Sequence, residues 1–182
     1  ILLKVLSSLR LSAPNIDLLK KELLVLGNNY NAIHMRTESD WPGGWDKTDI
    51  STIIDVYHKS ILVDNNDTLF FATGECHDKI TKSFKDHHIH THSFQRTNML
   101  YDLKTAISYT LCLLSKSFIS HPLSTFSSLI TMQRELIYNE QKNFSYNGTG
   151  LYKRLDRGLH YKKCYETPKG AATYVKVVSK IM

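Results

Sequence analysis

The sequence lacks the short glycine- and cysteine-based motifs that identify several common enzyme classes. Its 182 residues contain neither G-x-x-x-x-G-K-[ST] nor G-x-G-x-x-G, which argues against a P-loop and against a dinucleotide-binding site. No G-x-S-x-G motif is present, so a serine hydrolase is poorly supported. The 3 cysteines, Cys76, Cys112 and Cys164, form no C-x-x-C pair, and their odd number and wide spacing argue against a disulfide framework while leaving one bridge open.

Strong charge and long apolar runs are also missing. Lys and Arg total 23 against 17 Asp and Glu, and the net charge of +6 is spread along the chain without a block of like charges. We therefore expect no nucleic-acid partner, although a mild positive balance suits an anionic ligand such as a nucleotide. The apolar start, Ile1 to Leu6, is too short to cross a membrane, so we expect no membrane span in this chain.

The compartment stays open on the sequence. Three Asn-x-Ser/Thr sequons, at Asn66, Asn143 and Asn147, matter only in a secretory lumen, and such triplets arise often by chance. If this chain is eukaryotic, we expect it in the lumen of the ER or Golgi. If it is not, we expect it in the cytoplasm. The chain has no initiator Met, so we expect that something is missing upstream.

What the sequence does have is an alternation of amphipathic helices with short apolar strands. Helices are predicted over 15–26, 48–60, 77–84, 98–115 and 124–138, and strands over 30–35, 68–73, 89–94 and 117–120. Residues 139–167 read as loop, and 171–181 as a last helix or strand. The alternation predicts an α/β fold, with a Rossmann-like, mainly parallel sheet flanked by helices.

The first candidate site follows the strand predicted over 30–35. This strand runs into His34 and Arg36, with Glu38 and Asp40 close behind. Strands of an open α/β sheet deliver site residues at their carboxyl ends, and a guanidinium binds phosphate through a planar fork of donors. The alternative is an ordinary strand end with a surface ion pair.

The second candidate site opens the helix predicted over 124–138. Ser124, Thr125 and Phe126 follow a short strand and a Pro turn. Helix N-termini expose backbone N–H groups and a partial positive charge, so they bind phosphate. The alternative is plain N-capping by Ser and Thr. Further along this helix, Arg134 is expected to pair with Glu135 or Glu38.

Two weaker candidates remain. Glu75 follows the most apolar strand and could accept hydrogen bonds from a sugar or a base, although a solvated loop carboxylate is the default. A histidine group comprises His87, His88, His90 and His92, and alternating members on a strand would share one face. No partner stands at a standard metal-ligand spacing, so we predict a polar surface strand and no metal site.

Three of these segments together resemble the GDP-fucose-dependent protein O-fucosyltransferases. The segment 32–36, Ala-Ile-His-Met-Arg, resembles the H-x-R motif of the family. Leu69-Phe70-Phe71-Ala72-Thr73 is similar to its central strand, and 123–130 with Arg134-Glu135 is similar to its later serine-rich motif. The resemblance covers roughly residues 30–135, and three motifs in order are more specific than any one of them.

The resemblance implies a fold, an activity and residue roles. It implies a GT-B-type glycosyltransferase, of which this chain would be mainly the C-terminal, donor-binding half. Arg36 matches the arginine that contacts the diphosphate, and His34 matches the histidine that helps to hold the nucleotide. Ser124, Thr125 and Phe126 match residues that meet the phosphates and the nucleoside. The donor would be GDP-fucose or another nucleotide sugar, the acceptor a protein or glycan hydroxyl, and no cofactor or metal would be required.

Under this resemblance, residues 1–29 would be a helical lead-in from a missing or truncated N-terminal half, and 30–182 a nucleotide-sugar-binding domain. One departure concerns Ser108, where the family commonly has an acidic residue, so the donor base stays open. If inversion needs a general base, Glu38 and Asp40 are the local candidates. An ion pair with Arg36 is an equally good interpretation of either residue. Two other hypotheses are a non-catalytic nucleotide- or glycan-binding module and a metal- or nucleic-acid-binding domain.

Overall fold

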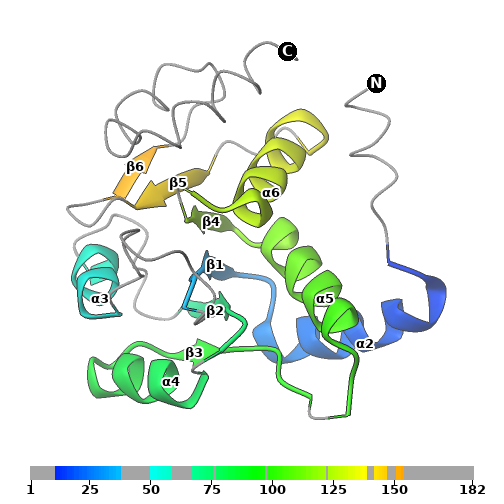
Figure 1. The fold of residues 1–182 in the computed structure, drawn as a ribbon, viewed down its shortest axis with the longest axis horizontal. Coiled ribbons are helices and arrows are strands. Elements are labelled where there is room, and N and C mark those ends of the chain that lie inside the picture. Colours follow the sequence, from blue (N-terminus) through cyan, green and yellow to red (C-terminus); the bar gives the residue numbers. More distant parts are fainter. Residues whose placement is uncertain are drawn as a thin grey trace.

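The computed structural model describes residues 11–37, 50–58, 67–75, 77–96, 98–121, 123–138, 142–146 and 151–153. They form one twisted sheet with helices on both sides (Figure 1). In chain order the elements are α2 (Ala13–Leu26), β1 (Tyr30–His34), α3 (Ile50–His58), β2 (Thr68–Ala72), α4 (His77–Asp86), β3 (Thr91–His92), α5 (Tyr101–Leu114), β4 (Ser117–Ser120), α6 (Thr125–Leu136), β5 (Asn143–Tyr146) and β6 (Leu151–Lys153).

The sheet has the strand order β3-β2-β1-β4-β5-β6, in which β1 to β5 run parallel and β6 pairs antiparallel with β5. The chain moves outward from β1 to β2 and β3, then returns to place β4 on the other side of β1. The predicted α/β, Rossmann-like and mainly parallel sheet is therefore confirmed. Because the strand order reverses between β1 and β4, a crevice is expected at their carboxyl ends.

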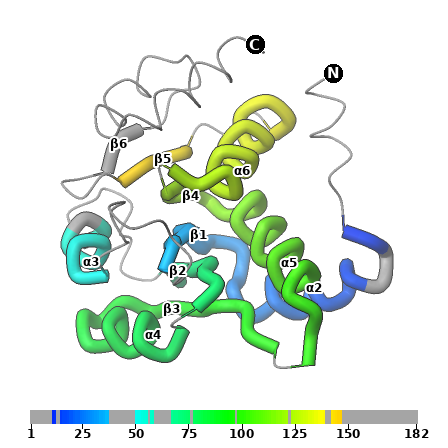
Figure 2. The backbone as a smooth tube through the Cα atoms, in the orientation of Figure 1, coloured from blue at the N-terminus to red at the C-terminus, as the bar shows by residue number. Residues whose placement is uncertain are grey.

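The sheet is buried on both faces. On one face, α2, α5 and α6 cover a core that includes Ala32, Phe70 and Phe118. On the other face, α3 and α4 cover a core that includes Ile33 and Phe71. Figure 2 shows these two helical layers, with the sheet between them. Successive side chains of a strand point to opposite faces, so β1 and β4, which are covered on both sides, are buried at every position.

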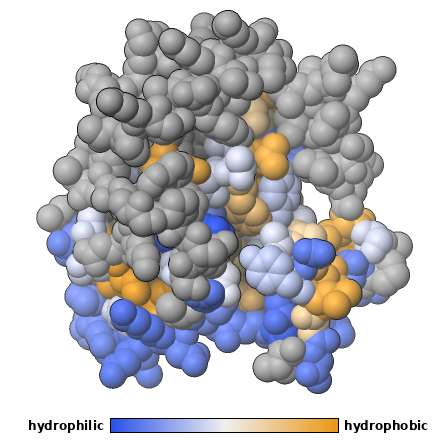
Figure 3. All heavy atoms as spheres, viewed as in Figure 1, coloured by the Kyte–Doolittle hydropathy of each residue, from blue (hydrophilic) through white to orange (hydrophobic). Residues whose placement is uncertain are grey.

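The outer helices have the opposite pattern, with one apolar and one polar side. In α4, Ile80 and Phe84 are fully buried against the sheet. Their spacing of four residues places both on one side of the helix. The outward side of α4 is hydrophilic, as the lower part of Figure 3 shows.

One prediction for the C-terminal part is wrong. Residues 139–167 read as loop, but β5 and β6 form within this segment. Asn143 and Ser145 have little intrinsic preference for strands, so no local signal marks this strand in the sequence. The parallel pairing of β5 with β4 supplies the missing backbone hydrogen bonds, beginning with one from Phe118 N–H to the carbonyl of Lys142 at 3.0 Å.

The other elements occur where the periodicity predicts them, with ends that differ by a few residues. The largest difference relative to length is β3, which is shorter than the predicted strand over 89–94. The element predicted over 171–181 lies outside the described residues. Helix α2 belongs to the expected lead-in, and its Leu19 and Leu26 are buried in the same core as β1. The division into 1–29 and 30–182 stays a prediction. Within the described ranges, no helix is long and apolar enough to span a bilayer.

Candidate functional site

A cavity of about 480 Å³ opens beside the carboxyl ends of β1 and β2 and the start of α6. This is the edge where the strand order reverses, since β1 ends at His34 and β4 ends at Ser120. The cavity is lined by His34, Arg36, Ala72, Thr73, Gly74, His77, Phe94, Gln95, Arg96, Tyr101, Lys104, Thr105, Ser108, Leu123, Ser124, Thr125 and Phe126.

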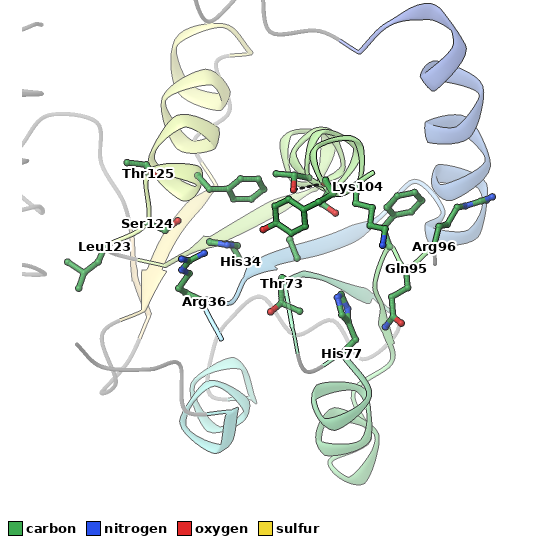
Figure 4. Close-up of a pocket in the computed structure, with 17 residues that line it drawn as sticks. His34, Arg36, Thr73, His77, Gln95, Arg96, Lys104, Leu123, Ser124 and Thr125 are labelled. Atoms are coloured by element: carbon green, nitrogen blue, oxygen red, sulfur yellow. Dashed lines mark hydrogen bonds between the residues drawn. The ribbon is translucent and has the colours of Figure 1, made fainter. Parts of the chain in front are cut away.

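The structure brings both main candidate segments of the sequence to this cavity. Arg36 reaches it from beyond β1, and Ser124 and Thr125 reach it from the start of α6 (Figure 4). Ser124 is the N-cap of α6, and its side chain accepts a hydrogen bond from Ser127 N–H at 3.5 Å. The first backbone N–H groups of any helix have no partner inside that helix. A guanidinium and a helix N-terminus therefore meet at one place, while their roles in ligand binding stay predictions.

The two histidines at this edge are neutral. His34 is only 6% exposed, and burial lowers its pKa to about 3, with smaller effects from nearby His121 and Arg36. Burial, followed by the charge of Arg36, lowers the pKa of His121 to about 4. At neutral pH the positive side chain at the ends of β1 and β4 is therefore Arg36, and both imidazoles are hydrogen-bonding groups without charge.

An aromatic cluster holds His34 in place. Its ring lies 4.6 Å from the ring of Phe126, centroid to centroid, with the planes tilted by 43°. Phe126 in turn meets Tyr109 edge to face at 5.6 Å. The hydroxyl of Tyr109 donates a 2.7 Å hydrogen bond to Gln133 Oε1. The cluster joins β1, α5 and α6, so it fixes this wall of the cavity through three elements.

Two threonines tie the loops after β1 and β2 together. The hydroxyls of Thr37 and Thr73 lie 2.6 Å apart, and each lies 3.1 Å from the backbone carbonyl of Glu75. Thr37 directly follows Arg36, so these contacts restrain the backbone that carries the guanidinium. The side chain of Glu75 is exposed, and Glu75 is not among the lining residues. Its predicted contact with a sugar or base stays a prediction.

Glu38 and Asp40, the candidates for a general base, lie outside the described residues. Their predicted role is therefore neither supported nor contradicted by the geometry of the cavity.

One side of α5 also lines the cavity, and of its residues the sequence had pointed only to Ser108, as a departure from the family pattern. Tyr101, Lys104 and Ser108 recur at steps of three and four residues, so they share one side of the helix. This spacing is the signal that could have identified them, although a polar helix side usually faces solvent. Lys104 points toward the cavity in Figure 4. Arg96 also lines it, and its guanidinium lies 3.6 Å from Glu22 of α2.

The histidine group does not assemble into a metal site. His87 contacts the carbonyl of Ser83, His90 contacts Thr68, and His92 contacts Glu22. Across the described part of the chain, no three His, Cys, Asp or Glu side chains gather closely enough to hold a metal ion.

Arg134 makes buried contacts to backbone carbonyls, while its predicted pair with Glu135 or Glu38 stays a prediction, and Glu38 lies outside the described residues. Arg134 is fully buried, and Nη1 donates hydrogen bonds to the carbonyls of Leu113 at 2.7 Å and Ser115 at 2.8 Å. These partners precede β4, so Arg134 lies at the amino ends of the strands, and it is not among the residues that line the cavity. We conclude that Arg134 stabilises the fold.

Comparisons with known proteins give a likeness in fold. No protein-family model matches the chain, and no curated protein matches its sequence. Among solved structures, POFUT1 in complex with GDP-fucose matches with a TM-score of 0.59 and 18% identity, covering 78% of this chain and 49% of that chain. POFUT1 in complex with GDP matches with a TM-score of 0.59 and 18% identity, covering 78% and 50%. The apo form gives a TM-score of 0.56 at 18% identity, covering 79% and 49%.

The chain thus spans about half the length of the POFUT1 chains that it matches. At this level of identity the likeness shows the fold alone. The predicted fold class, a Rossmann-like lobe of the GT-B type, is confirmed.

Proposed function

We propose that this chain binds a nucleotide sugar as the donor-binding lobe of a glycosyltransferase. The observation that carries the proposal is that Arg36 and the start of α6 line one cavity at the reversal of strand order. Open α/β sheets bind their ligands at such a point. The fold is shared with POFUT1 structures that hold GDP or GDP-fucose, which favours GDP-fucose as the donor.

The charges of the cavity suit a diphosphate. Arg36 provides a planar fork of donors, and the first turn of α6 provides backbone N–H groups with a partial positive charge. During glycosyl transfer, negative charge grows on the departing phosphate as the bond to the sugar breaks. Fixed donors at that position stabilise the transition state more than the bound substrate. In this proposal His34, Ser124, Thr125 and Phe126 hold the nucleotide, and Arg36 also supports departure of the leaving group.

The proposed reaction is transfer of fucose to a protein or glycan hydroxyl with inversion. Inversion by direct displacement calls for a base that accepts the proton of the acceptor hydroxyl. Glu38 and Asp40 follow the H-x-R segment closely and are the candidates within this chain. No metal or cofactor takes part in the proposed step, because Arg36 and the helix N-terminus supply the positive charge.

A non-catalytic nucleotide- or glycan-binding module is the second candidate. It is favoured by the coverage of the matches, since this chain spans about half of each POFUT1 chain. In a two-lobed transferase the acceptor site can lie in the other half, so a single lobe can retain donor binding without turnover.

Isothermal titration calorimetry with GDP, GDP-fucose, UDP and zinc chloride tests the proposal. We expect saturable binding of GDP and GDP-fucose, and we expect Arg36→Ala to weaken it by about a hundredfold, because a charge-assisted, bidentate contact to phosphate is lost. Lys82→Ala is the matched control, because Lys82 is an exposed cation on the outer side of α4. Its affinity should equal that of the unaltered chain.

No diphosphate binding, or equal binding by Arg36→Ala, would overturn the proposed site. Binding of zinc alone would support the metal-binding hypothesis instead. Transfer from labelled GDP-fucose by the complete polypeptide then separates enzyme from binding module, because the module predicts binding without product.

A further inference from the structure

Ser127 lies between His34, the last residue of β1, and His121, which directly follows β4. Ser127 is fully buried in the first turn of α6. Its Oγ accepts a hydrogen bond from the backbone N–H of His121 at 2.9 Å. The same Oγ lies 2.8 Å from Nδ1 of His34, although 93 residues separate the two in the sequence. The hydroxyl therefore bridges the loop after β4 and the last residue of β1.

The positions of the hydrogens follow from these two contacts. A backbone N–H can only donate, so Ser127 Oγ is the acceptor toward His121. The hydroxyl has one hydrogen of its own to donate, and among its contacts in the described residues Nδ1 of His34 is the remaining partner. If Nδ1 also carried a hydrogen, two donors would face Oγ. The buried hydroxyl hydrogen would then have no acceptor, which is unfavourable inside a protein.

We propose that Ser127 is a positioning residue that holds His34 in the tautomer with its hydrogen on Nε2. Nδ1 then accepts the hydroxyl hydrogen of Ser127, and Nε2 presents an N–H donor on a side chain that lines the cavity. Phe126 packs against the ring and limits its rotation. The tautomer is a property of the free protein.

The environment of His34 keeps the ring neutral, so that it carries one N–H. The charged or titratable groups that act on it are Arg36, two residues along the chain, and His121, from the loop after β4. Both groups disfavour a positive imidazole, as does burial, and all three lower the pKa of His34.

The consequence for ligand binding rests on the proposed function. A neutral N–H donor beside Arg36 can bond an anionic oxygen of the nucleotide diphosphate without bringing a second positive charge close to the guanidinium. His34 would thereby provide a directional hydrogen bond to the phosphate oxygen, and Arg36 would provide the positive charge. Ser127 touches no ligand in this arrangement, since it acts through the ring of His34.

The first experiment determines the tautomer by long-range ¹H–¹⁵N correlation NMR on the ligand-free chain, labelled with ¹⁵N-histidine. The signals of His34 are identified by their loss in His34→Gln. We expect one neutral tautomer, with a hydrogen-bearing Nε2 and a bare Nδ1. A hydrogen on Nδ1, or an even mixture of the two tautomers, would overturn the proposal without any need for a Ser127 variant.

The second experiment repeats the spectrum on Ser127→Ala, with Ser128→Ala as the matched control. Both residues are buried neighbours in α6, but the contact to His34 belongs to Ser127. We expect the two nitrogen shifts of His34 to move toward each other in Ser127→Ala, because the tautomers then exchange, and to stay in place in Ser128→Ala. An unchanged His34 spectrum in a folded Ser127→Ala chain would contradict the role of Ser127.

The third experiment compares two amides at position 34 by titration with GDP. The Gln amide reaches the position of Nε2, whereas the shorter Asn amide reaches that of Nδ1. We expect His34→Asn to bind GDP about tenfold or more weakly than His34→Gln, because the Gln amide alone keeps a donor at the position of Nε2. Equal losses in both variants would refute a donor at Nε2. If the unaltered chain does not bind GDP, the proposed function fails, and the NMR spectra still decide the tautomer.

Discussion

Arg134 Nε donates a 2.7 Å hydrogen bond to Oδ1 of Asn143 and thereby joins α6 to the first residue of β5. Nη1 of the same guanidinium contacts the carbonyls of Cys112, Leu113 and Ser115 at the carboxyl end of α5. One buried cation thus connects α5, α6 and β5 at the amino ends of the strands, while the candidate site lies at their carboxyl ends. The two arginines that the sequence pointed to therefore have different roles. Arg134 stabilises the fold, and Arg36 lines the candidate site.

The first prediction concerns stability. We expect Arg134→Ala to lower the free energy of unfolding by roughly 3–5 kcal/mol, because truncation of a buried, hydrogen-bonded cation leaves its partners unsatisfied. Urea denaturation followed by circular dichroism measures the change. Lys20→Ala is the control, because Lys20 forms an exposed pair with Asp17 at 3.3 Å. That variant should change stability by no more than about 1 kcal/mol. A similarly small effect for Arg134→Ala would contradict the structural role.

The second prediction concerns pH. In the folded chain the pKa of His34 is lowered to about 3 and that of His121 to about 4, both from 6.5. Between these values and 6.5 the unfolded chain binds more protons than the folded chain, so acid favours unfolding. We expect the free energy of unfolding to reach its maximum above about pH 6.5. It should fall by a few kcal/mol on acidification to about pH 4. Urea titrations at several pH values measure this slope.

The matched control for the pH experiment replaces both histidines, as His34→Gln with His121→Gln. The double variant has neither lowered pKa, so its stability should depend much less on pH over the same window. The partly exposed carboxylates respond equally in both proteins and cancel in the comparison. If the unaltered chain and the double variant show the same slope, the two histidines are not the acid-sensitive groups.

The third prediction concerns the α5 side of the cavity. Lys104 lines the cavity, although it is far from both candidate segments in the sequence. It points inward in Figure 4. We expect Lys104→Met to weaken GDP binding by about tenfold, because a donor to the ligand is lost while the aliphatic stem is kept. Calorimetry measures the affinity, and Lys85→Met on α4 is the control. Equal affinities for the two variants would show that the ligand does not extend to α5.

Local sequence patterns were sufficient to predict most of the helices and strands. The strand Thr68–Ala72, which is apolar after Thr68, and the amphipathic helix Tyr101–Leu114 have patterns that identify them without tertiary information. The strand Asn143–Tyr146 could not be found in this way. Asn and Ser occupy alternate positions there, and the strand exists because β4 offers it an edge. The contacts of Arg134 were equally hidden, since a charged residue on a helix normally faces water.

For the candidate site, the sequence by itself determined which local chemistry is present: a guanidinium after one strand, and hydroxyl side chains at the start of one helix. It also determined that both lie where strands of an α/β sheet end, because apolar runs give way to polar residues there. Only the tertiary structure decided that these two segments share a cavity with one side of α5. It also decided that His34 is a neutral group that contacts Ser127. The physical reason is that strand order, burial and the orientation of a ring depend on contacts between residues far apart in the chain, which no local pattern encodes.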